Sequence, residues 1–113
     1  FVSFVKNLPP DDFYKLLAGS ACAVGNSSSF IREGAYFGTP VVLIGSRQFK
    51  RERAENVIEV GCAREEIKTA ISNQLAKGRY KPSLMFGEGN SGGKIASILA
   101  TINPTIQKSF VDL

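Results

Sequence analysis

Residues 21–44 read ACAVGNSSSFIREGAYFGTPVVLI, and this stretch decides the fold class. Val41-Val42-Leu43-Ile44 is a β-branched apolar run between a proline and a glycine, which is typical of a buried strand. A shorter apolar run over residues 21–24 stops at a glycine and predicts a second buried strand. Between the two runs, a helix is expected to begin among the serines and to end at Phe37. Strand, helix and strand in this order predict a βαβ unit with parallel strands.

The same alternation continues on both sides of this unit. Further strands are expected over residues 1–5 and 57–60, and a helix from Pro10 to Gly19. A helix over residues 64–77 is expected to bury its apolar side chains, Ile67, Ala70, Ile71 and Leu75. A last helix is marked by Ile95, Ile98, Leu99 and Ile102. The pattern predicts a single α/β domain over residues 1–113, with a Rossmann-like parallel sheet and flanking helices.

Composition narrows the function classes. The chain has 113 residues, of which 43% are hydrophobic and 21% charged, enough for one core. No apolar run approaches the roughly 20 residues that cross a membrane, so no membrane association is expected. The net charge of +4 lacks an aromatic-interleaved basic motif and suits an anionic small ligand better than nucleic acid. With no histidine and two cysteines 40 positions apart, neither a metal site nor a disulfide framework is predicted.

The turn Gly25-Asn26-Ser27-Ser28-Ser29 is the first candidate site. It lies where a parallel strand ends and a helix begins, the place where open α/β sheets bind ligands. A helix N-terminus offers unpaired N–H groups and partial positive charge, and serine hydroxyls add donors. The turn is therefore a candidate diphosphate site. The alternative is that Asn26 and the serines only cap the helix.

Two charged residues extend this candidate site. Glu33 follows Ser29 by four residues, so it faces the turn from one helical turn further on, where a carboxylate accepts hydrogen bonds from a ribose diol. Arg47 follows the strongest strand and is placed to contact a phosphate. The alternatives are a surface glutamate and a solvated loop arginine. No pair of carboxylates has a spacing typical of acid and base catalysis.

An ordered set of motifs then resembles a known family. The residues that carry it are Gly25-Asn26-Ser27-Ser28-Ser29, Arg32-Glu33, Phe37-Gly38-Thr39-Pro40-Val41, Gly45-Ser46-Arg47-Gln48, Arg51-Glu52, Glu55-Asn56-Val57 and Phe86-Gly87-Glu88-Gly89-Asn90. Over nearly its whole length the chain resembles the UDP-N-acetylglucosamine 2-epimerase family, and most closely its hydrolysing branch.

The resemblance implies a two-domain, glycosyltransferase-B-like architecture with the active site in the cleft between domains. This chain would be most of the C-terminal domain, in keeping with its lack of an initiator Met. The catalytic residues are unknown and are expected on a missing N-terminal domain. No cofactor is implied. The full-length protein is expected to be cytoplasmic and a homo-oligomer.

Site residues follow from the resemblance by position. Ser27 and Ser28 would bind the diphosphate, and Glu33 the ribose. Arg47 would contact the phosphate side of the nucleotide, and Leu8 the uracil. Gly25, Asn26 and Ser29 are possible additional contacts in the same turn. Phe30 departs from the family, where a small residue is more usual, and would either narrow the sugar pocket or pack against it.

The implied reaction is elimination of UDP across C1–C2 of UDP-N-acetylglucosamine, followed by addition of water. The products would be UDP and N-acetylmannosamine or a related 2-epimerised sugar, for synthesis of sialic-acid-like sugars. Three alternatives stay open at this point: a non-hydrolysing epimerase, a glycosyltransferase of the same architecture, and a non-catalytic nucleotide-binding module.

Overall fold

Three parallel strands form the centre of the molecule. The structure is a computed structural model that describes residues 2–103. The strands are β1 (Ala23–Gly25), β2 (Val41–Ile44) and β3 (Val57–Val60), in the spatial order β1-β2-β3. In the central strand, Val41 pairs with Ala23 on one side and with Val57 on the other. This strand is fully buried over its first three residues, as expected for a parallel strand covered on both faces.

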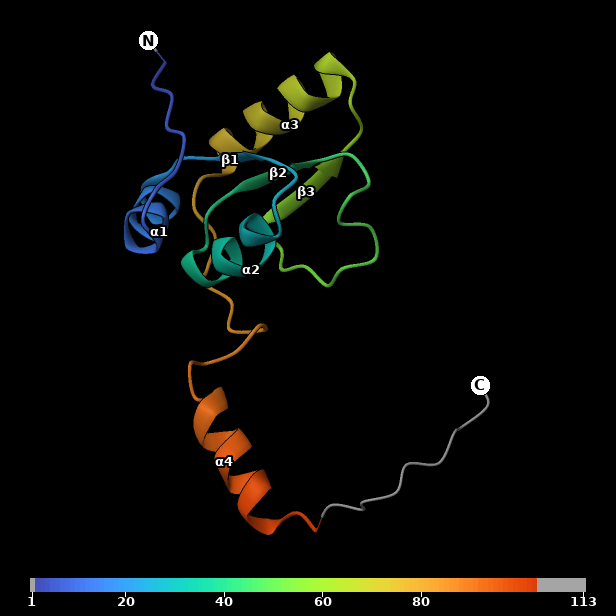
Figure 1. Ribbon diagram of the computed structural model, residues 1–113. Helices are drawn as coiled ribbons and strands as arrows, with labels where there is room; N and C mark the ends of the chain where they lie inside the picture. Colours follow the sequence, from blue (N-terminus) through green and yellow to red (C-terminus); the bar gives the residue numbers. More distant parts are fainter. Residues whose placement is uncertain (1, 104–113) are drawn as a thin grey trace.

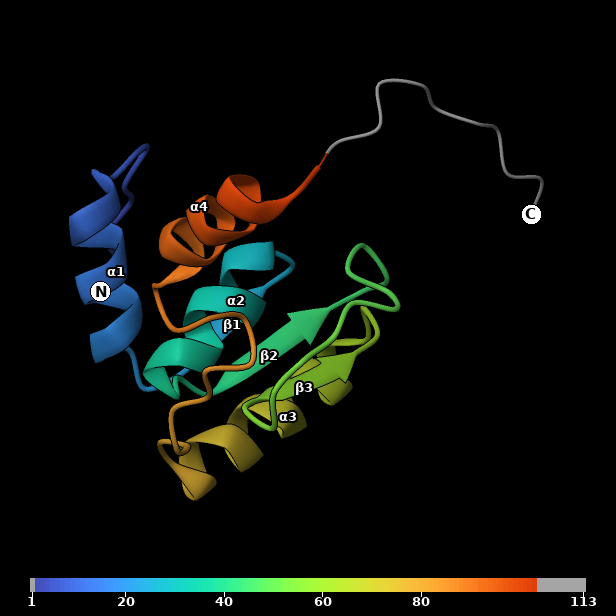
Figure 2. The same cartoon turned by 90° about the horizontal axis from the view of Figure 1, so that it is seen from below.

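Helices cover both faces of this sheet (Figures 1 and 2). α2 (Ser28–Phe37) and α3 (Arg64–Lys77) lie on opposite faces, and α1 (Pro10–Gly19) packs against α2. The predicted α/β, Rossmann-like fold is therefore confirmed.

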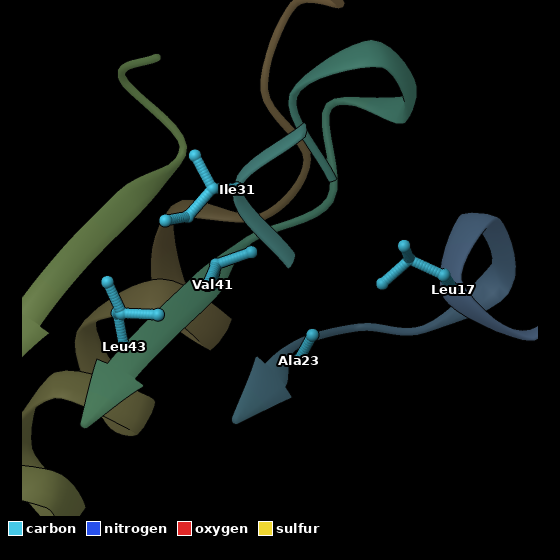
Figure 3. Packing of buried hydrophobic residues seen from close by; sticks show 5 residues of the cluster. All are labelled: Leu17, Ala23, Ile31, Val41 and Leu43. Carbon is cyan, nitrogen blue, oxygen red and sulfur yellow. The ribbon is translucent and has the colours of Figure 1, made fainter. Parts of the chain in front are cut away.

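One apolar cluster holds α1, α2 and the sheet together. It contains Leu17 of α1, Ala23 of β1, Ile31 of α2, and Val41 and Leu43 of β2 (Figure 3). Each of these residues is at most 7% exposed. Burying each of the larger side chains in this cluster stabilises the fold by about 1.5–3 kcal/mol. This cluster fixes the start of α2 relative to the ends of β1 and β2, where the candidate site lies.

Two expectations about the elements were wrong. Residues 2–5 of the predicted first strand form no strand in the structure, and Phe4 is 95% exposed; Phe1 lies outside the described residues. A strand needs a hydrogen-bonded neighbour, and no strand of the described sheet pairs with this segment. In α3, Leu75 was expected to face inward but is 51% exposed, whereas the polar Gln74 is fully buried.

The last helix, α4 (Ser91–Thr101), stands apart from the sheet and its covering helices (Figure 1). None of its residues is buried, and Ile95, Ile98 and Leu99 are each more than half exposed. Within residues 2–103, no helix is both long enough and apolar enough to cross a membrane.

Candidate functional site

The turn after β1 has the geometry of an anion-binding helix start. Gly25 has a φ of 154°, a conformation that side-chain-bearing residues rarely adopt. Ser27 is the N-cap of α2, and its hydroxyl accepts a hydrogen bond from the Ser29 amide at 3.3 Å. Within residues 2–103, the backbone amides of Ser27 and Ser28 have no acceptor. Two N–H donors and the positive end of the helix are thus available to a negatively charged group.

The loop after β2 comes to the same turn. Arg47 Nη1 lies 3.4 Å from Asn26 Oδ1, so the guanidinium is next to the helix start. This bond is exposed to solvent, which leaves the arginine free to turn toward an anion. The structure therefore brings together the turn after β1 and the arginine after β2, as the parallel topology predicts.

Glu33 lies one helical turn further along α2 and lines a cavity of about 340 Å³. One of its carboxylate oxygens, Oε2, is buried and has no hydrogen-bond partner within the described residues. The other lining residues are mostly aromatic: Tyr14, Arg32, Tyr36, Phe37, Ser83, Phe86 and Gly87. A ligand with hydroxyl groups would supply the donors that this oxygen lacks.

A second cavity, of about 480 Å³, contains other predicted site residues. Leu8, Ser27 and Ser29 line it. Tyr14 of α1 lines both this cavity and the one at Glu33. Ser28 and Arg47 line neither cavity. Leu8, Ser27 and Ser29 therefore share one cavity at the helix start of α2, and Glu33 lines the other, with Tyr14 bordering both.

Comparison with known proteins decides the family. The sequence profile described as UDP-N-acetylglucosamine 2-epimerase matches residues 1–100. The chain belongs to the UDP-N-acetylglucosamine 2-epimerase family.

Curated relatives agree with this epimerase assignment. The chain is 40% identical over 101 residues to a UDP-N,N'-diacetylbacillosamine 2-epimerase (hydrolyzing) of Legionella pneumophila, covering 89% of this chain and 27% of that protein. It is 31% identical over 107 residues to a UDP-N-acetylglucosamine 2-epimerase of Neisseria meningitidis, covering 89% of this chain and 28% of that protein. The chain thus spans little more than a quarter of the length of these relatives.

Phe30 packs toward the core of this epimerase-family domain. Its ring joins the apolar cluster and lies over Gly25, where an added Cβ would come within 3.1 Å of Phe30 Cε2. Phe30 lines neither the cavity at Glu33 nor the one at Leu8. The ring therefore packs against the core and Gly25, and both roles predicted for it at the sugar pocket stay predictions. The ring also adds a second reason for a glycine at position 25.

Gln48 is the residue that sequence reasoning did not assign. Its side chain is in a loop, yet the residue is only 5% exposed, and its Nε2 donates to the Asn26 carbonyl oxygen at 2.9 Å. Its Oε1 is buried without a partner in the described part of the chain. Such an unsatisfied acceptor costs about 1–3 kcal/mol. The sequence contains no sign that a glutamine in a charged loop is buried. From sequence, Gln48 was identified only as part of the motif Gly45-Ser46-Arg47-Gln48.

Other candidate chemical groups are few in the described part of this family member. No cluster of three or more histidine, cysteine, aspartate or glutamate residues suited to a metal ion occurs within residues 2–103. Cys22 and Cys62 are free thiols. Burial raises the pKa of the Cys22 thiol, partly offset by a backbone hydrogen bond from Val42, so this cysteine is poorly suited to act as a nucleophile at neutral pH.

Proposed function

We propose that this chain is the UDP-binding part of a hydrolysing 2-epimerase that acts on a UDP-linked N-acetylated sugar. The observation that carries the proposal is the turn at Gly25–Ser29, where two unpaired amides and Arg47 converge at the start of a helix. Family membership supplies the nucleotide, since both relatives described above are named for UDP-sugars. The hydrolysing outcome follows the relative at 40% identity, whose name includes that reaction.

In this proposal the described residues hold the leaving group. The amides of Ser27 and Ser28 and the Arg47 guanidinium stabilise the diphosphate, whose negative charge rises as the bond to C1 breaks. Glu33 accepts hydrogen bonds from the ribose, using its unpaired Oε2. Leu8 borders the cavity assigned to the uracil. The groups that remove the C2 proton and return it are proposed to lie in the remaining three quarters of the protein.

The reaction is tested on the full-length protein with two substrates, UDP-N-acetylglucosamine and UDP-N,N'-diacetylbacillosamine. We expect free UDP and a 2-epimerised free sugar, identified by NMR. A product that is still a UDP-sugar would indicate the non-hydrolysing reaction. Transfer of the sugar to an acceptor would indicate a glycosyltransferase. UDP binding without turnover of either substrate would leave a nucleotide-binding module and overturn the enzymatic proposal.

The role of Glu33 is tested with a matched pair of ligands. Replacing Glu33 with alanine removes a charged acceptor, so UDP affinity should fall by about 1.5–3 kcal/mol, or roughly 10- to 150-fold. The same substitution should leave the affinity for 2′,3′-dideoxy-UDP unchanged, because that ligand lacks both ribose hydroxyls. Isothermal titration calorimetry measures both affinities. Equal losses for the two ligands would show that Glu33 does not bind the ribose.

A further inference from the structure

The side chain of Gln48 forms a hydrogen bond with the backbone of the turn at Gly25–Ser29, the proposed diphosphate site. Its Nε2 donates to the carbonyl oxygen of Asn26 at 2.9 Å, across 22 positions of sequence. From this contact we infer that Gln48 is a positioning residue for the anion site: it orients the peptide between Asn26 and Ser27. The inference rests on the proposed function and names a residue through which the site is built.

The planarity of the peptide bond links this contact to the site. In a trans peptide the C=O and the following N–H point in opposite directions. When Gln48 holds the Asn26 carbonyl, the Ser27 N–H is directed away from Gln48. Within residues 2–103 this N–H has no acceptor, and neither has that of Ser28. The ψ angle of Asn26 and the φ angle of Ser27 set the orientation of this peptide, and the hydrogen bond from Gln48 restricts both angles.

Gln48 is itself fixed from the side of β3. Its carbonyl oxygen accepts hydrogen bonds from the Arg51 amide at 3.2 Å and from Arg53 Nη2 at 3.3 Å. Arg53 also forms an ion pair with Glu59 of β3. Contacts with β3 thus fix the loop after β2, and Gln48 of that loop fixes the turn at Gly25–Ser29. The buried Oε1 of Gln48 has no partner in the described part of the chain, so the residue is not optimised for stability alone.

The test compares Gln48→Met with Gln74→Met in the full-length protein. Both variants replace a buried glutamine with an apolar side chain of similar length, but Gln74 contacts the opposite end of the sheet. For Gln48→Met we expect UDP affinity to fall about tenfold, the effect of one misdirected donor to a charged group. Uridine affinity should change less than twofold, because uridine has no phosphate. Gln74→Met should lower the unfolding midpoint without changing the ratio of UDP to uridine affinity.

Two further variants keep the test decisive if a methionine variant fails to fold. Gln48→Asn keeps a buried amide but is one methylene too short to reach Asn26, so it should show the same selective loss of UDP affinity. Tyr80→Phe removes one hydrogen bond to Gln74 and serves as the milder control. Equal losses for UDP and uridine in the Gln48 variants, or no loss, would overturn the inference. Failure of the unmodified protein to bind UDP would instead overturn the proposed function itself.

Discussion

The two ends of the parallel sheet differ in how two sets of hydrogen-bond donors are used: those of Gln74 are paired, and the amides of Ser27 and Ser28 are not, within the described part of the chain. At the amino ends of β2 and β3, buried side chains bind backbone carbonyls. Gln74 Nε2 donates to Val41 and Asn56 carbonyl oxygens at 2.8 and 2.9 Å, and its Oε1 accepts from the Tyr80 hydroxyl at 2.7 Å. At the carboxyl ends, the amides of Ser27 and Ser28 have no acceptor within residues 2–103.

This difference separates stability from binding within one small domain. Each polar atom of the Gln74 amide has a partner, so burying it stabilises the fold. Asn56 links this network to Thr39, because its Nδ2 donates to the Thr39 carbonyl oxygen at 2.8 Å, and the Thr39 hydroxyl donates to the Leu17 carbonyl oxygen at 2.9 Å. A ligand site needs the opposite arrangement, because donors that are already paired cannot bind an anion. Substitutions at the amino end should therefore change stability, and those at the carboxyl end should change affinity.

The largest effect is expected from Gln74→Met. The substitution removes two hydrogen bonds to the carbonyl oxygens of Val41 and Asn56 and leaves the Tyr80 hydroxyl without its acceptor, so the domain should lose about 4 kcal/mol of stability. Tyr80→Phe, which removes one of the three bonds, should cost about 1 kcal/mol. Urea denaturation measures both, and hydrogen exchange of the β2 amides reports on this domain within a longer chain. Similar losses in the two variants would mean that the amide of Gln74 is not the centre of this network.

Two glycines on either side of β2 provide the next comparison. Gly38 and Gly45 both have positive φ, 65° and 75°. A Cβ at Gly38 would come within 2.2 Å of the Tyr80 carbonyl oxygen, whereas at Gly45 it would meet only Cys62 Sγ at 3.8 Å. Gly38→Ala should therefore cost about 3 kcal/mol of stability, and Gly45→Ala about 1 kcal/mol from the backbone conformation alone. Thermal unfolding of the two variants measures this, and a reversed order would contradict the packing at the amino end.

The carboxyl end was easier to predict from sequence than the amino end. The turn at Gly25–Ser29 and Arg47 follow apolar strands, and parallel topology places both at one edge. The bounds of β2, β3 and α3 were also predicted, because β-branched runs and helical periods are local signals. Gln74 was missed because apolar periodicity treats a glutamine as a surface residue, and Leu75 was assigned to the core instead.

The failed prediction at residues 2–5 has a different physical cause. Aromatic and β-branched residues favour extended backbone, but a strand is stable only beside another strand. None of the described strands pairs with this segment. Likewise, the buried side chain of Gln48 depends on contacts 22 positions away, with Asn26. Neither the lack of a neighbouring strand at residues 2–5 nor the contact between Gln48 and Asn26 can be read from a local stretch of sequence.

The smallest effects should come from two arginines, one at each end of the sheet. Arg79 donates to the carbonyl oxygens of Phe37 at 3.1 Å and Ser20 at 3.0 Å, so Arg79→Ala should cost about 1 kcal/mol of stability and leave UDP affinity unchanged. Arg47 makes one exposed contact, so Arg47→Ala should change stability by less than about 0.5 kcal/mol but weaken UDP binding about tenfold.

Calorimetry at two salt concentrations separates a local contact of Arg47 from the general effect of positive charge. The net charge of +4 attracts any anion, and that attraction is screened by salt. Removing either arginine lowers the net charge equally, so a general effect would weaken UDP binding to the same extent in both variants, and more at low salt. A loss confined to Arg47→Ala at both salt concentrations would assign the phosphate contact to the carboxyl end of the sheet. Equal losses would show that Arg47 acts only through the overall charge of the domain.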